Sequence, residues 1–249
     1  MKRIMLRVAY DGTAYNGWQI QPGGTTIEGE LNKALSDLLE EEIAVIGASR
    51  TDAGVHALCN VAVFDTDTRI APERIAPALN ARLTEDIRIQ ESREVASDFH
   101  PRKCPTRKTY EYRIYTGKYE NPIGRQYAHF VYVPLDEEKM QKAAEYLVGE
   151  HDFKSFCVAK AQVLTTVRTV YAVQVKREGS YLTIRVSGSG FLFNMVRIIA
   201  GTLIEVGRGS MEPEQVKAIL EAKDRQAAGP TAPARGLTLI SLEFCEKRD

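Results

Sequence analysis

The sequence predicts an α+β fold that is built from two β-α-β-β-α-β units. In some short segments apolar residues alternate with polar ones, which is typical of strands with one buried face. In other segments apolar residues recur every three or four positions, as on the buried face of a helix. The two kinds of segment follow one another in the order β-α-β-β-α-β, and the second half of the chain repeats this order with insertions.

Length and composition agree with a globular enzyme or binding protein. With 249 residues, 44% hydrophobic and 27% charged, the chain can form one large or two small domains. Its four cysteines are far apart and form no Cys-x-x-Cys, so a disulfide framework or zinc site is not expected. The charged start is unlike a signal peptide, and the apolar segment 191–206 is too short and polar for a membrane span. We therefore expect a cytoplasmic protein with no membrane segment.

The first unit is predicted over residues 1–104. Its segments are, in order, a strand over 3–10, a helix opened by a capping box at 25–28, a hairpin of strands over 43–46 and 55–63, a helix over 72–83 and a strand around 87–89. Residues 97–106 contain two prolines and are expected to connect the two units.

The second unit is predicted over residues 105–249. Its segments are a strand over 109–115, a helix with Asp136 as N-cap, a hairpin of strands over 167–175 and 182–186, a buried helix over 191–206, a helix opened by Pro213 and a strand over 237–244. This order is the ferredoxin-like, or RRM-like, unit. Two such units can share one extended antiparallel sheet with helices on one face.

One polar connection stands out, Arg50-Thr51-Asp52-Ala53-Gly54-Val55-His56, because it lies between the two strands of the predicted hairpin. An Asp followed by Gly in a hairpin can simply form a turn. A carboxylate that is held on a rigid hairpin beside Arg50 can instead act as a nucleophile or a general base. The local chemistry leaves both interpretations open.

Arg197 is unusual because it interrupts the apolar segment 191–201. A buried guanidinium requires a partner, since an unpaired buried charge is very costly. Three interpretations stay open. Arg197 can form a structural salt bridge with an acid, it can lie at an exposed edge of the helix, or it can belong to a functional site.

A basic strip contains Arg102, Lys103, Arg107, Lys108 and Arg113, with Glu111 as its only acid. The net charge of zero argues against a protein that is basic over its whole surface. A local strip on a neutral protein is compatible with binding a folded polyanion on one face. The alternative is a solvated strand edge.

Several of these segments resemble the motifs of the tRNA pseudouridine synthase I (TruA) family, and the resemblance covers nearly the whole chain. The matching segments are 50–56, Asp11-Gly12 with Gly17-Trp18-Gln19, Tyr110-Glu111-Tyr112, and 191–201. The resemblance implies the pseudouridine synthase fold with an RNA-binding cleft between its halves. It also implies isomerisation of uridine to pseudouridine at positions 38, 39 and 40 of tRNA, by a homodimer that binds tRNA across both subunits. The reaction requires no cofactor or metal.

The resemblance also implies roles for individual residues. Asp52 would be the catalytic carboxylate, and Arg50 and Arg197 would keep it ionised and oriented. Tyr110 would stack on the flipped-out uracil. We expect further substrate contacts from His56, Arg102, Lys103 and Arg107, although both His56 and His100 are more often structural in such positions. The role of Asp52 stays open between attack at C1′, attack on the base and removal of the 2′ proton.

Two other functions compete with this one. A non-catalytic RNA-binding module of two RRM-like units would normally carry aromatic RNP motifs on its central strands, and the sequence has none. A metal-dependent hydrolase that uses Asp52 and His56 lacks a convincing set of further ligands.

Overall fold

The computed structural model describes residues 1–158 and 164–245, which divide into two compact units. Unit 1 comprises residues 1–106 and the described residues 239–245, and unit 2 comprises residues 107–238. The expected domain boundary between residues 104 and 105 stays a prediction. Within the described residues no helix is long and apolar enough to cross a membrane.

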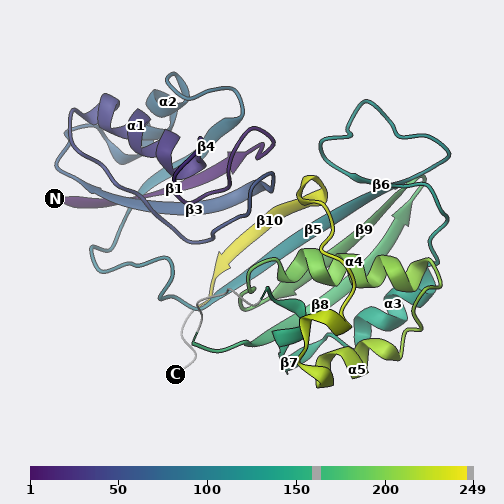
Figure 1. Ribbon diagram of the computed structural model, residues 1–249. Helices are drawn as coiled ribbons and strands as arrows, with labels where there is room; N and C mark the ends of the chain where they lie inside the picture. The colour runs from purple at the N-terminus through teal and green to yellow at the C-terminus, as the bar shows by residue number, and fades with distance from the viewer. Residues whose placement is uncertain (159–163, 246–249) are drawn as a thin grey trace. The chain divides into compact units, whose positions relative to one another are not determined.

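Unit 1 begins with one β-α-β-β-α-β pattern. Its elements are β1 (Lys2–Tyr10), α1 (Ile27–Leu39), β2 (Ile46–Gly47), β3 (His56–Thr66), α2 (Pro72–Asn80) and β4 (Ile87–Val95). The sheet order is β4-β1-β3, with β2 also paired to β3, and all of these pairs are antiparallel. This is the strand order of a ferredoxin-like unit. Helices α1 and α2 cover one face of these strands (Figure 1), where Ile4, Leu6 and Val8 are fully buried.

The other face of the unit 1 sheet is also apolar. Met5, Val61 and Val63 form a buried cluster there with Leu242. Leu242 belongs to the last strand, β10 (Leu237–Phe244). The ring of Phe244 packs edge-on against Phe99 with 5.0 Å between the ring centroids. The far end of the chain therefore completes the core of unit 1.

Two local predictions in unit 1 were wrong. The first hairpin strand is only two residues long, because Ile43 N–H and Val45 N–H donate to side chains of α1, Ser36 Oγ and Asn32 Oδ1, instead of to a neighbouring strand. The capping box is also absent. The N-cap is Thr26, which accepts from Gly29 N–H at 3.2 Å.

Unit 2 carries the second set of elements. They are β5 (Thr106–Thr116), β6 (His129–Val131), α3 (Glu137–Glu145), β7 (Gly149–Asp152), η1 (Phe153–Phe156), β8 (Val167–Glu178), β9 (Tyr181–Gly188), α4 (Met195–Gly207), α5 (Gln215–Ala222), η2 (Arg225–Ala227) and η3 (Ala234–Gly236). The sheet order is β5-β9-β8-β7, all antiparallel, and β6 pairs with β5 in parallel. Helices α3, α4 and α5 lie on one face of these strands (Figure 1). The predicted fold class, α+β with ferredoxin-like units, is confirmed.

Helix α4 begins at Met195 and not at residue 191 as predicted. Asn194 adopts a left-handed conformation with φ 60°, which interrupts a helix and places the preceding residues in a loop. The body of α4 is buried on almost all sides, and Gly201 allows Pro230 to approach its backbone. A Cβ at Gly201 would lie 1.8 Å from the carbonyl oxygen of Pro230.

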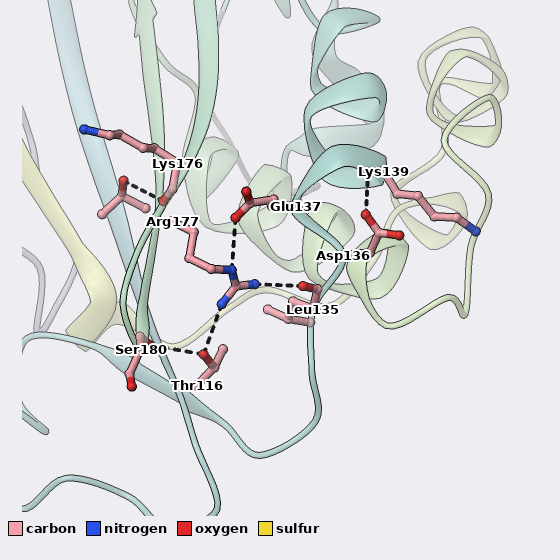
Figure 2. Close-up of polar contacts among 9 residues, drawn as sticks. Thr116, Leu135, Asp136, Glu137, Lys139, Lys176, Arg177 and Ser180 are labelled. Atoms are coloured by element: carbon pink, nitrogen blue, oxygen red, sulfur yellow. Dashed lines mark hydrogen bonds and ion pairs between the residues drawn. The ribbon is translucent and has the colours of Figure 1, made fainter.

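Arg177, near the end of β8, ties three segments of unit 2 together (Figure 2). Its guanidinium donates to Glu137 Oε2 at 3.0 Å, to the carbonyl oxygen of Leu135 at 2.7 Å and to Thr116 Oγ1 at 3.3 Å. The planar fork of an arginine can serve all three acceptors at once. Arg177 thereby connects β8 with the start of α3 and the end of β5.

We predict that Arg177→Met lowers the free energy of unfolding by about 1–3 kcal/mol, because partly buried acceptors lose a charged donor. The matched control is Lys176→Met in the same strand, where the pair with Glu178 has 62% and 73% of its two side chains exposed. Exposed pairs contribute at most about 1 kcal/mol. Urea unfolding of both variants measures the difference, and equal losses would contradict the role of Arg177.

Candidate active site

The Asp52 loop, residues 49–55, is held by main-chain contacts with the loop that follows β1. Trp18 N–H donates to the carbonyl oxygen of Thr51 at 3.0 Å, and Gly54 N–H donates to that of Tyr15 at 3.2 Å. Within the loop, Val55 N–H donates to the carbonyl oxygen of Asp52 at 3.1 Å, which closes a tight turn. Both sides of the Asp52 turn are therefore tied to a second segment.

Glycine is required where these two loops meet. Gly17 has φ +85°, and a Cβ there would lie 2.6 Å from the carbonyl oxygen of Thr51. Gly12 is as close, since its Cβ would lie 2.1 Å from the carbonyl oxygen of Val55. Trp18 is fully buried beside them, which agrees with a packing role for its indole. The close approach of the two backbones explains why this segment contains two glycines.

Asp52 is half-buried at the turn, while Arg50 is exposed. Arg102 is a second cation beside this loop, and partial burial, followed by the charge of Arg50, lowers the pKa of its guanidinium. Arg102 Nε donates to the carbonyl oxygen of Gly47 at 2.7 Å, at the end of β2. Two guanidinium groups, those of Arg50 and Arg102, therefore lie at the root of the Asp52 loop, where positive charge attracts a phosphate.

His56, at the start of β3, is 4% exposed. Its Nδ1 accepts from Gly12 N–H at 3.0 Å and lies 3.1 Å from Asp11 Oδ1. These contacts hold the loop after β1 and favour a structural role. A direct contact between His56 and substrate stays a prediction, as does one from Lys103, which is exposed in the turn after His100.

Tyr110 lies on β5, where it pairs with Val186 of β9 and is 7% exposed. Its ring meets that of Phe191 edge-on, with 5.3 Å between the centroids and an interplanar angle of 89°. Phe191 belongs to the loop before α4, and the sequence did not single out this pairing. Tyr112 is fully buried on the same strand and donates to the carbonyl oxygen of Pro233 at 2.9 Å, so it is a core residue.

Arg197 is half-buried in the first turn of α4. Its Nε donates to the carbonyl oxygen of Ala232 at 2.8 Å, and its Nη1 donates to Asn194 Oδ1 at 2.8 Å. Ala232 N–H returns a hydrogen bond to the carbonyl oxygen of Arg197 at 3.1 Å. The guanidinium is thus oriented by a main-chain carbonyl and by the residue that caps its own helix.

Arg107 is exposed at the start of β5, with its guanidinium carbon 4.8 Å above the ring centroid of Tyr171. Such stacking orders an arginine without removing its hydrogen-bond donors. Tyr171 was missed by the sequence reasoning. The register shift between Val170 and Ala172 marks an irregular pairing of β8 at this position, which alternation along the chain does not reveal.

The predicted site residues fall into two sets. Unit 1 holds Asp52, Arg50, His56, Arg102 and Lys103, and unit 2 holds Tyr110, Arg107 and Arg197. Within unit 1 the structure brings Asp52, Arg50 and His56 onto one short segment, with Arg102 beside it. Among the described side chains, no three of His, Cys, Asp and Glu gather closely enough to hold a metal ion.

Comparison with known proteins matches the sequence of the chain to one family. A family model described as tRNA pseudouridine synthase matches residues 7–102 and 143–244. Proteins named tRNA pseudouridine synthase A are similar over the full length. The protein of Bacillus subtilis (strain 168) is 46% identical over 97% of this chain and 99% of its own, and that of Thermoanaerobacter sp. (strain X514) is 44% identical over 98% and 100%. That of Exiguobacterium sp. (strain ATCC BAA-1283 / AT1b) is 46% identical over the whole of both chains.

We predict that Gly17→Ala destabilises the protein by about 1–3 kcal/mol more than Gly23→Ala. Both glycines have a positive φ, +85° and +90°, so both alanines are strained, but a Cβ at Gly23 meets nothing within 4 Å. Only Gly17→Ala pushes against the carbonyl oxygen of Thr51. Thermal and urea unfolding measure the difference, and equal shifts would show that the two loops can separate without cost.

Proposed function

Since the chain belongs to the tRNA pseudouridine synthase family and isomerises uridine to pseudouridine in tRNA, we propose that its targets are uridines 38, 39 and 40 of the anticodon stem-loop. The similarity to relatives named tRNA pseudouridine synthase A, which extends over their full length, carries this proposal. In the same proposal the carboxylate of Asp52 carries the chemistry.

The reaction breaks the N1–C1′ bond of a uridine, turns the base and joins C5 to C1′; C5 then loses its proton and N1 takes one up. No electron is gained or lost, so the chain's own residues can provide all the chemistry. The target uridine must leave the helical stack to be reached. Asp52 is suited to this work because it is half-buried on a loop whose backbone is tied on both sides. A charged group that is held in place needs little reorganisation when the bonds change.

Two arginines are proposed to keep the carboxylate ionised. Arg50 lies two residues before Asp52 on the same loop. Arg197 is proposed from its match to the family motif whose arginine pairs with the catalytic aspartate, and its guanidinium is oriented by Ala232 and Asn194. A cation near a carboxylate lowers its pKa and so favours the charged form at neutral pH.

Tyr110 is proposed to stack on the uracil of the flipped nucleotide. Only 7% of the residue is exposed, so a uracil can reach the ring only after a neighbouring side chain moves. Lys103 and Arg107 are exposed and Arg102 is anchored through its Nε, and these three are proposed to contact RNA phosphates. His56 is proposed to support the substrate from its buried position.

We further propose that the protein is cytoplasmic and acts as a homodimer with tRNA bound across both subunits. The cysteines Cys59, Cys104, Cys157 and Cys245 are free thiols, which suits a reducing compartment. Unit 2 exposes apolar side chains between residues 117 and 132, namely Tyr119, Ile123, Tyr127 and Tyr132. A group of this kind is typical of surfaces that meet a macromolecular partner.

We predict that Asp52→Asn lowers turnover by roughly 10³-fold or more, because the amide cannot act as a nucleophile or base. Binding of tRNA should be nearly unchanged, since most of it comes from phosphate contacts. Release of tritium from tRNA labelled at C5 of uridine measures turnover, and filter binding measures affinity. The control is Asp37→Asn, the same change at an exposed position of α1, which should have wild-type turnover. Turnover near the wild-type rate by a pure Asp52→Asn preparation would refute the assignment.

Two substitutions of Tyr110 separate its ring from its hydroxyl. Tyr110→Phe keeps the stacking face, so the variant should bind tRNA normally. We predict that it turns over far more slowly than wild type, because the hydroxyl is expected to remove the C5 proton, directly or through a water. Tyr110→Leu removes the face and should weaken binding of the flipped nucleotide by roughly 1–3 kcal/mol. Full activity of the Phe variant would refute the proton role alone. Normal activity of the Leu variant would exclude Tyr110 from the site.

A further inference from the structure

The side chain of Asn60 replaces a piece of sheet backbone beside the Asp52 loop. Between β1 and β3 the register shifts, so that Val8 pairs with Asn60 but Tyr10 pairs with Ala57. The Asn60 side chain is fully buried at this irregularity. Its Oδ1 accepts from Ser49 N–H at 3.2 Å, and its Nδ2 donates to the carbonyl oxygen of Ser49 at 3.0 Å. The carboxamide therefore binds both main-chain groups of Ser49, as a neighbouring strand would.

Tyr10 extends this contact to the next part of the loop. Its hydroxyl accepts from Asn60 Nδ2 at 3.3 Å and lies 2.7 Å from Thr51 Oγ1. Tyr10 is 4% exposed, and burial raises the pKa of its hydroxyl, which therefore stays protonated. Because Asn60 Nδ2 can only donate, the tyrosine oxygen accepts from it, and the proton of the Tyr10–Thr51 hydrogen bond can come from either hydroxyl.

These contacts hold alternate residues of the loop. Ser49 is 4% and Thr51 is 8% exposed. Asn60 binds the backbone of Ser49, and Tyr10 binds the hydroxyl of Thr51. Arg50, between them, is exposed, and Asp52 is half-buried. The loop thus has two buried neutral anchors, Ser49 and Thr51, and its charged residues Arg50 and Asp52 are more exposed.

We propose that Tyr10 and Asn60 are positioning residues for the reaction, because they fix the backbone on both sides of Arg50 and thereby the place of the Asp52 carboxylate. The proposal rests on the proposed function, since it takes Asp52 as the reacting group. Neither side chain needs to touch RNA. Loss of the Tyr10 hydroxyl would remove one hydrogen-bond partner from the Thr51 hydroxyl and one from the Asn60 amide. These buried groups can find new partners only if the loop moves.

The test removes one tyrosine–threonine hydrogen bond at a time. Thr51→Val and Tyr10→Phe remove the contact at the Asp52 loop. Thr84→Val is the matched control, because Thr84 Oγ1 lies 3.1 Å from the Tyr15 hydroxyl in the same unit. Single-turnover rates at saturating tRNA, tRNA affinity and melting temperature are measured for each. Small displacements of a reacting group reduce rates strongly, so we expect a loss of roughly 10- to 100-fold in the first two variants.

Affinity for tRNA should be unchanged in all three variants, and the control should keep the wild-type rate. Thr51→Ser, which retains the hydroxyl, should restore most of the rate. If Asp52→Asn is inactive while Thr51→Val and Tyr10→Phe match the control, the positioning role is overturned and the proposed function stands. The positioning role would also be overturned if Thr84→Val lost as much rate as the other two variants and the loss followed the decrease in melting temperature. An active Asp52→Asn would instead overturn the proposed function.

Discussion

The structure around the candidate site depends on one interaction, in which the side-chain amide of Asn60 hydrogen-bonds the backbone of Ser49 as a neighbouring strand would. Strand β2 ends at Gly47, and the preceding residues give their N–H groups to side chains of α1. A chain that leaves a sheet so early would normally be free to move. Asn60 holds the chain beyond the last ladder pair with a fully satisfied buried amide, which is costly to disturb. The turn at Asp52, and the place where Gly17 approaches the backbone of Thr51, come directly after that anchor.

Unit 2 positions a charge by a related principle. Arg197 lies in an apolar helix, yet its guanidinium is directed by the carbonyl oxygen of Ala232. The loop that contains Ala232 is itself held against α4. Pro230 approaches the backbone of Gly201 closely, and Thr202 Oγ1 accepts a hydrogen bond from Gly229 N–H at 3.0 Å. In both units short-range contacts with rigid backbone decide where a charged group stands. Such contacts cost little reorganisation when charge moves during a reaction.

Much of the fold could be predicted from patterns in the sequence, because burial on one face imposes a period of two or of 3.6 residues. Strands β1, β3, β9 and β10 follow directly from alternation, and the buried helix containing Arg197 from its run of apolar residues. Features that depend on distant partners could not be predicted in this way. The late start of α4 follows from one left-handed residue, Asn194. In the sequence Tyr10 is simply the end of a strand, because its partners Thr51 and Asn60 are about 40 and 50 residues away.

The packing of β10 has a consequence for how the protein is made. Leu242 and Phe244 fill the same core as Met5 and Phe99, so the first hundred residues lack part of their interior until the final strand arrives. A ribosome makes β10 about 140 residues after Phe99, which at roughly 5–20 residues per second takes about 7–30 s, and the core of the N-terminal part cannot close before then. During synthesis the apolar face of Met5 and Val63 is a surface that a chaperone can shield.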